Sequence, residues 1–136
     1  MKVVSDFKLA PGRALLHAIS GGRVSEGIDF PDRELEVAVL VGIPYPKPTA
    51  KQKALQYYYD IKFGKGWDYT VKAPTARRML QAIGRLIRSE HDRGVAVILD
   101  RRAAQFKEYL PDLRETADPA MDVAAFWSST KERPEK

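Results

Sequence analysis

The sequence of residues 75–99 is TARRMLQAIGRLIRSEHDRGVAVIL, an arginine-rich stretch followed by a short apolar run. In the first part, apolar residues recur at helical spacing and predict a helix from Thr75 to Arg88. Thr75 directly follows Pro74 and is the expected N-cap. The second part, residues 95–99, is short and rich in Val and Ile, which favours a β-strand. A helix leading into a strand is typical of an α/β domain.

Two further apolar runs lie upstream, at residues 14–19 and 37–41. Neither alternates strictly with polar residues, so both predict strands that are covered on both faces, as in parallel sheets. Further helices are expected at 49–63, after three closely spaced prolines, at 102–109 and at 121–127. The pattern predicts a three-layer α/β domain, with a mainly parallel sheet and helices on both faces. It occupies residues 1–129, and residues 130–136 form a polar tail.

The composition excludes several classes of site. The chain has 136 residues, with 23 Lys and Arg against 18 Asp and Glu, a formal net charge of +5 and no Cys. Without cysteine there is no disulfide, thiolate nucleophile or Cys-ligated metal, and the two His show no metal-motif spacing. The apolar runs are far shorter than the ~20 residues that span a bilayer, and the first eight residues lack a signal-peptide core. We expect a soluble, cytoplasmic protein with no membrane contact.

The predicted helix at 75–88 carries a row of arginines. At 100° per residue, four arginines fall within about 60° of Gln81. The row consists of Gln81, Arg77, Arg78, Arg85 and Arg88, and residues 75–89 contain no acid. Exposed helix faces usually mix both signs of charge, and the planar guanidinium fork suits phosphate. The row indicates a phosphate-bearing ligand; the alternative is a solvated basic face.

Two other segments suggest nucleic-acid chemistry. Residues 21–30, GGRVSEGIDF, follow the first apolar run, and their three glycines would let a phosphate approach backbone N–H groups. The alternative is an ordinary tight loop. Residues 44–93 hold eleven basic residues against four acids, interleaved with six Tyr and Trp. Basic and aromatic residues together favour single-stranded nucleic acid, although about half of these rings are expected to be structural.

Several motifs resemble those of a known family. Residues 22–30, GRVSEGIDF, resemble motif V of superfamily 2 helicases in the form typical of the XPD/DinG branch, and residues 81–88, QAIGRLIR, resemble motif VI. The segments at 42–46, 92–94 and 99–102 are also similar to the family's pattern. The resemblance runs from about Leu15 to Pro111. It implies the second RecA-like motor domain of a 5′→3′ DNA helicase, truncated here by the absence of the motif IV strand and helix at its N-terminus.

The resemblance also implies roles for individual residues. Arg85 and Arg88, with Gln81 beside them, would reach the γ-phosphate of ATP, which with its Mg²⁺ would be held mainly by the first helicase domain in cis. The nucleotide side would comprise Asp29, Gly27 and Glu26. Contacts to single-stranded DNA would come from Gly22, Arg23, Ser25, Lys47 and Lys51. The Walker A and B motifs are missing from the sequence, so the chain alone is expected not to hydrolyse ATP.

Two other functions stay open at this point. One is a free-standing module that binds single-stranded nucleic acid without catalysis. The other is a regulatory fragment that docks on the ATPase domain of a partner.

Overall fold

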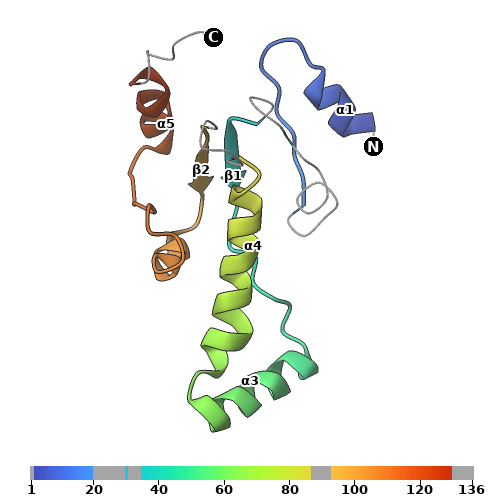
Figure 1. Ribbon diagram of the computed structural model, residues 1–136, viewed down its shortest axis with the longest axis vertical. Coiled ribbons are helices and arrows are strands. Elements are labelled where there is room, and N and C mark those ends of the chain that lie inside the picture. Colours follow the sequence, from blue (N-terminus) through green and yellow to red (C-terminus); the bar gives the residue numbers. More distant parts are fainter. Residues whose placement is uncertain (1, 20–29, 31–34, 87–92, 130–136) are drawn as a thin grey trace. The chain divides into compact units, whose positions relative to one another are not determined.

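The computed structural model describes residues 2–19, 30, 35–86 and 93–129. It divides into two compact units, Met1–Asp100 and Arg101–Lys136. The described elements follow one another as helices and strands (Figure 1), so the predicted α/β class is confirmed.

Strands β1 (Val37–Leu40) and β2 (Val95–Ile98) form a parallel pair. Val37 lies opposite Val95, and Leu40 lies opposite Ile98. Both strands and their parallel pairing were predicted from the apolar runs. The predicted burial on both faces is wrong for the described residues, because none of the eight strand residues is fully buried and Val39 is 51% exposed.

The strand predicted at residues 14–19 is absent. Residues 13–19 adopt no regular secondary structure, and Leu15 and Ile19 are 77% and 84% exposed. His17, expected inside a buried strand, is exposed. A strand needs a hydrogen-bonded neighbour, and no described residue pairs with this run in a sheet. The apolar composition alone could not reveal that.

Helix α1 (Lys2–Lys8) contributes to a small hydrophobic cluster. Val4 and Phe30 are both buried, and Leu16, Leu35 and Phe7 pack against them. The rings of Phe7 and Phe30 meet edge to face, with their centroids 6.0 Å apart. The cluster fixes Phe30, the last residue of the glycine-rich stretch, against the N-terminal helix.

Helix α3 (Ala50–Phe63) matches the helix predicted at 49–63. Thr49 caps its N-terminus, with its Oγ1 accepting from the backbone N–H of Gln52 at 3.1 Å. Gly64 ends the helix with a φ of +65°, a left-handed conformation that glycine adopts without strain. Its N–H donates to the carbonyl of Asp60 at 2.9 Å.

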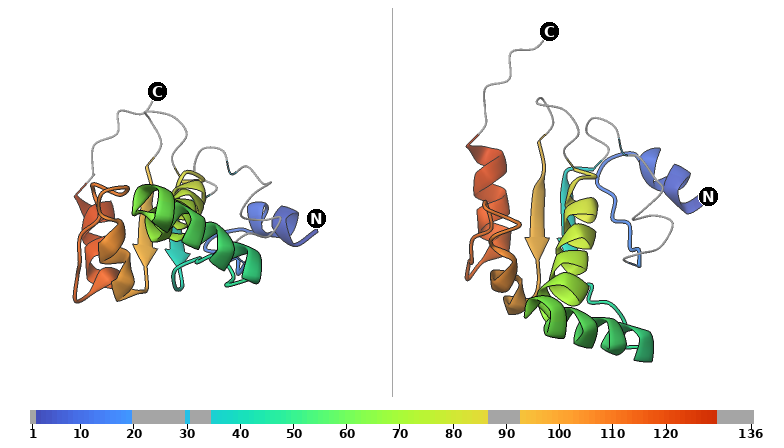
Figure 2. Two further views of the ribbon diagram at one scale, coloured as in Figure 1. Left: turned by 90° about the horizontal axis from the view of Figure 1, so that it is seen from below. Right: turned by 60° about the horizontal axis from the view of Figure 1, so that its bottom comes forward.

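A π-helical turn, η1 (Asp68–Lys72), runs directly into helix α4 (Ala73–Ile83). The prediction that Thr75 is an N-cap is therefore wrong. Thr75 is a buried helical residue whose Oγ1 donates to the carbonyl of Val71 at 2.7 Å. Pro74 has no N–H to offer the carbonyl of Thr70 four residues earlier. That carbonyl instead accepts from the Nε2 of Gln52 on α3. The proline thus creates the acceptor that ties α3 to η1, and α3 runs across the start of the η1–α4 helix (Figure 2).

Helix α4 buries one side and exposes the other. Met79 is fully buried and Leu86, just beyond the helix, is 3% exposed, whereas Leu80 is 43% exposed. The apolar residues expected to share one face therefore differ in burial. Ile87, another apolar residue at helical spacing in the predicted helix, lies outside the described residues.

The second unit contains a 3₁₀ helix, η2 (Arg101–Phe106), and helix α5 (Pro119–Ser128). The helix expected at 102–109 is thus a shorter 3₁₀ segment. With three residues per turn, it places Ala103 and Phe106 on the same side, and both are buried. Asp118 caps α5, with its Oδ1 accepting from the N–H of Met121 at 2.9 Å. In the part of the chain that the structure describes, no helix is long and apolar enough to cross a membrane.

Candidate functional site

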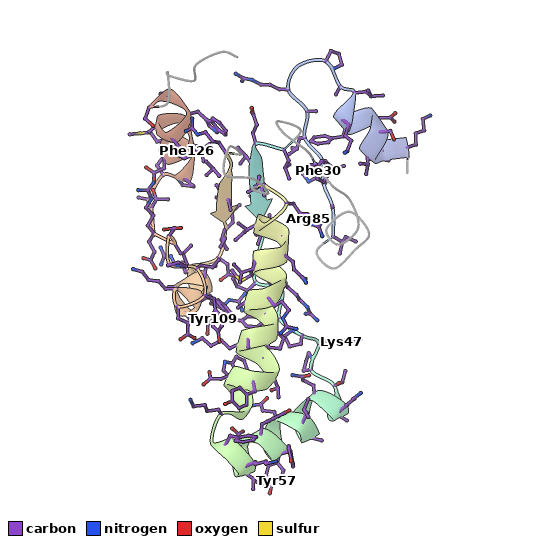
Figure 3. The ribbon with its side chains drawn as sticks, in the orientation of Figure 1. Phe30, Lys47, Tyr57, Arg85, Tyr109 and Phe126 are labelled. Atoms are coloured by element: carbon purple, nitrogen blue, oxygen red, sulfur yellow. The ribbon has the colours of Figure 1, made fainter. Side chains whose placement is uncertain are left out.

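Arg85 lies on the turn that follows α4 and is half-buried (Figure 3). The turn is held by backbone hydrogen bonds, including one of 2.9 Å from the N–H of Leu86 to the carbonyl of Ile83. A Cβ placed on Gly94 would lie only 2.8 Å from the Cβ of Leu86, so a larger residue at position 94 would push this side chain away. The buried Leu86 and the close approach of Gly94 therefore hold the turn that carries Arg85.

The other predicted members of the arginine row divide into two groups. Arg77, Arg78 and Gln81 lie on α4 and are exposed, while Arg88 lies outside the described residues. Arg78 is engaged within the fold, because its Nη1 donates to the carbonyl of Pro44 at 3.1 Å. This hydrogen bond joins α4 to the loop that follows β1.

We expect Arg78→Ala to loosen the loop at residues 42–48 with only a small loss of global stability. The bond is exposed, so its removal should lower the free energy of unfolding by no more than about 1 kcal/mol. Amide hydrogen exchange in the loop should become faster, as measured by mass spectrometry. Arg77→Ala is the matched control, and equal acceleration in both variants would contradict the anchoring role of Arg78.

Three further contacts, besides the Arg78–Pro44 hydrogen bond, hold the loop and α3 on the η1–α4 helix. The rings of Tyr45 and Trp67 lie 6.2 Å apart, and Asp60 Oδ1 accepts from the N–H of Gly66 at 2.7 Å. A Cβ on Gly66 would collide with the carbonyl of Gln56, so only glycine fits this close approach. The Gln52–Thr70 hydrogen bond is the third contact. Sequence reasoning missed these contacts, since only the Gly66 position hints at a close helix approach.

The predicted DNA-contacting residues are only partly described. Lys47, on the loop before α3, and Lys51, in the first turn of α3, are both exposed. Lys47 is labelled in Figure 3. The remaining predicted residues of the glycine-rich stretch lie outside the described residues: Gly22, Arg23, Ser25, Glu26, Gly27 and Asp29. Their predicted roles stay predictions.

The aromatic residues of the basic segment are more exposed than the sequence suggested. Helix α3 has no buried residue, and Tyr57 and Tyr58 are 69% and 52% exposed. Tyr59 is half-buried and contacts three other rings, those of Tyr58, Phe63 and Tyr69. About half of the rings in this segment were expected to be structural; none of the three consecutive tyrosines is buried, and Tyr59 alone among them is half-buried, packed between other rings.

Metal binding finds no support in the described part of the chain. Among those residues, no group of three or more His, Asp or Glu side chains is arranged to hold an ion. The charged residues of the candidate site that the structure describes, Arg77, Arg78, Arg85, Lys47 and Lys51, are all cationic, which suits an anionic ligand.

Comparison with known proteins identifies related chains. A family model described as "Helicase C-terminal domain" matches residues 1–119. The "Regulator of telomere elongation helicase 1 homolog" of Oryza sativa subsp. japonica is 36% identical over 98 residues, covering 65% of this chain and 10% of the relative. The "Probable ATP-dependent helicase" of Methanocaldococcus jannaschii is 36% identical over 122 residues, covering 78% of this chain and 18% of the relative.

A bacterial protein is similar as well. The "3'-5' exonuclease DinG" of Bacillus subtilis is 41% identical over 102 residues, covering 74% of this chain and 11% of the relative. The chain therefore spans between a tenth and a fifth of the length of these three relatives.

Proposed function

The chain belongs to the helicase C-terminal domain family, as the second RecA-like domain of an XPD/DinG-type helicase, and from this premise we propose that it forms half of an ATP-driven DNA motor. In this proposal a first motor domain, in cis, holds ATP and Mg²⁺. The present chain supplies arginines to the phosphates and contacts to single-stranded DNA.

The observation that carries the proposal is the position of Arg85. It lies on a half-buried turn that directly follows α4, and the sequence from 75 to 89 contains no acidic residue. A guanidinium held there can reach a phosphate presented by another domain without the loss of conformational entropy that ordering a flexible turn would require. Arg88 and Gln81 would act beside it, and Asp29, Gly27 and Glu26 would face the nucleotide. ATP supplies the transferable phosphoryl group, and these residues would orient and stabilise it.

The DNA-contacting part of the proposal involves a second set of residues. Lys47 and Lys51 are exposed cations close together in sequence, on the loop and helix that follow β1. With Arg23 they would neutralise backbone phosphates of a single DNA strand, and Gly22 and Ser25 would lie near that strand. Lys47 and Arg78 belong to one scaffold, since Arg78 donates to the carbonyl of Pro44 in the same loop that carries Lys47. Movement of α4 on ATP binding would therefore move this loop along the bound DNA strand.

The test uses the 136-residue chain. We expect no ATP turnover by the chain alone, and weak binding of a fluorescent dT oligonucleotide with a modest dependence on salt. If Lys47, Lys51 and Arg23 each neutralise one phosphate, the slope of log K against log[salt] is about −2.1. Lys47→Ala with Lys51→Ala should reduce that slope, whereas Lys2→Ala, which removes an exposed lysine of α1, should not. ATP turnover by the chain alone would contradict the proposal.

The exposed lysines and rings of α3 also favour the second candidate, a module that binds single-stranded nucleic acid without catalysis. Tight binding by the chain alone, unchanged when a first motor domain is added with ATP, would support this alternative. A half-motor predicts that the added domain and nucleotide change the affinity.

A further inference from the structure

Helix α3 and the start of η1 present an unusual surface. In a soluble domain, a 14-residue helix normally buries an apolar stripe, yet no residue of α3 is buried. Its exposed apolar and aromatic side chains continue onto the segment before α4; they are Leu55, Tyr57, Tyr58, Ile61, Phe63, Trp67 and Tyr69. Exposed apolar side chains gathered in this way commonly mark a binding site.

Four of the rings form one connected group, which we call the ring cluster: Tyr58, Tyr59, Phe63 and Tyr69. Tyr59 stacks on Phe63 with centroids 5.8 Å apart and meets the edges of Tyr58 and Tyr69 at 5.5 and 5.6 Å. These contacts fix the rings in place, while Tyr58, Phe63 and Tyr69 remain about half exposed. A set of rings that is already ordered loses little entropy when a planar ligand stacks on it.

The charge around the ring cluster is positive. The Nζ of Lys62 lies 5.5 Å from the ring centroid of Tyr58 and 5.3 Å from that of Phe63, and it donates to the Tyr58 hydroxyl at 3.1 Å. Lys51 and Lys53 lie on the same helix, whose one acid, Asp60, accepts from the N–H of Gly66. Within the described ranges, no carboxylate pairs with these three lysines.

We propose that the ring cluster of α3 is a stacking site for the bases of single-stranded DNA, with Lys62 holding the adjacent phosphate. Half-exposed rings interleaved with unpaired lysines match a strand that offers planar bases and anionic phosphates together. An apolar protein partner would match the rings but leave Lys62 without a counter-charge. Lys51 and Lys62 share one side of α3, about 16 Å apart at 1.5 Å per residue, so the site would hold two or three nucleotides. The inference rests on the proposed function, because it takes the ligand to be single-stranded DNA.

The experiment compares two oligonucleotides of twelve units bound to the full 136-residue chain. One is oligo-dT, and the other is an abasic strand with the same phosphates and no bases. Tyr58→Ala and Phe63→Ala should each weaken oligo-dT binding about 5- to 150-fold, the loss expected for one stacked base, and leave abasic binding unchanged. Fluorescence anisotropy measures both affinities.

Three controls separate stacking from charge and from misfolding. Tyr57→Ala removes a more exposed ring that makes no ring contact among the described residues, and should change neither affinity. Tyr58→Phe keeps the ring and should retain oligo-dT binding. Lys62→Ala should weaken both oligonucleotides equally. Circular dichroism checks each fold, and retention by Tyr58→Phe keeps the test valid if an alanine variant unfolds.

Each contrary outcome has a definite meaning. If the chain binds both oligonucleotides equally and Tyr58→Ala changes neither affinity, stacking is wrong while the phosphate contacts of the proposed function stand. If the chain binds neither oligonucleotide, even when joined to a first motor domain, both proposals are wrong. If Tyr58→Ala instead abolishes association with that domain, the ring cluster is a protein interface and the inference is overturned.

Discussion

Replacing Arg85 by alanine is expected to lower ATP turnover by about 10³-fold or more in a polypeptide that joins this chain to a first motor domain with Walker A and B motifs. An arginine supplied across a domain interface contributes about 10³–10⁵ in rate in other nucleotide hydrolases. Arg85 has the position for this role, on a turn fixed by the buried Leu86. The measurement is kcat for ATP hydrolysis at saturating single-stranded DNA.

The control variants separate catalysis from folding and from DNA binding. Arg77→Ala removes an exposed guanidinium from the middle of α4 and should leave kcat within about threefold. Arg85→Lys keeps the charge but loses the planar fork, so it should recover little of the activity. Oligonucleotide affinity should stay near that of the parent for Arg85→Ala. A parallel loss of turnover and of DNA binding would refute the assignment of Arg85 to the nucleotide.

The two strands were predictable from the sequence because their composition favours strands and because each has the other as a pairing partner in the fold. Residues 37–41 and 95–99 are rich in β-branched Val and Ile and each run borders a glycine on one side, and they contain β1 and β2. Residues 14–19 have comparable apolar content but no described partner strand, so they form none. Pairing is a long-range property, and the composition of one segment does not specify it.

The start of α4 shows a different reason for error. A Thr after a Pro is a good local N-cap signal, but Pro74 lies inside a helical run that begins before it. The run tolerates the proline because η1 changes the hydrogen-bond spacing and Gln52 satisfies the carbonyl of Thr70. The compensating group lies on another helix, 18 residues away in sequence, so a local rule could not identify it.

The candidate site was predictable in its chemistry but less so in its geometry. The arginine row is visible in the sequence because it lacks acidic neighbours. The sequence did not indicate that Arg78 turns to the carbonyl of Pro44, or that the helix ends at Ile83, before Arg85. A helical wheel that continues unchanged through residue 88 therefore assigned phosphate binding to both Arg78 and Arg85, although Arg78 holds a loop within the fold.

Replacing Met79 by alanine should produce the largest loss of stability available on α4. Met79 is fully buried, and truncating a buried Met to Ala costs about 2–5 kcal/mol, a large part of the 5–15 kcal/mol that holds a domain folded. Leu80→Ala is the matched control, because Leu80 is the next residue, of similar volume, and 43% exposed. It should cost less than about 1 kcal/mol, since alanine is at least as good a helix former as leucine.

Urea denaturation followed by circular dichroism measures the difference. A loss of 2–5 kcal/mol corresponds to a midpoint lower by about 1–3 M in urea, whereas Leu80→Ala should shift it by about 0.5 M or less. Equal shifts would show that Met79 is not in the core that supports α4. The turn that carries Arg85 directly follows α4 and is hydrogen-bonded to its last residue, Ile83. A loosened α4 should therefore also displace Arg85 and lower ATP turnover in the joined polypeptide. That loss should recover at lower temperature, while the loss caused by Arg85→Ala should persist, because Arg85→Ala removes a chemical group and leaves the fold intact.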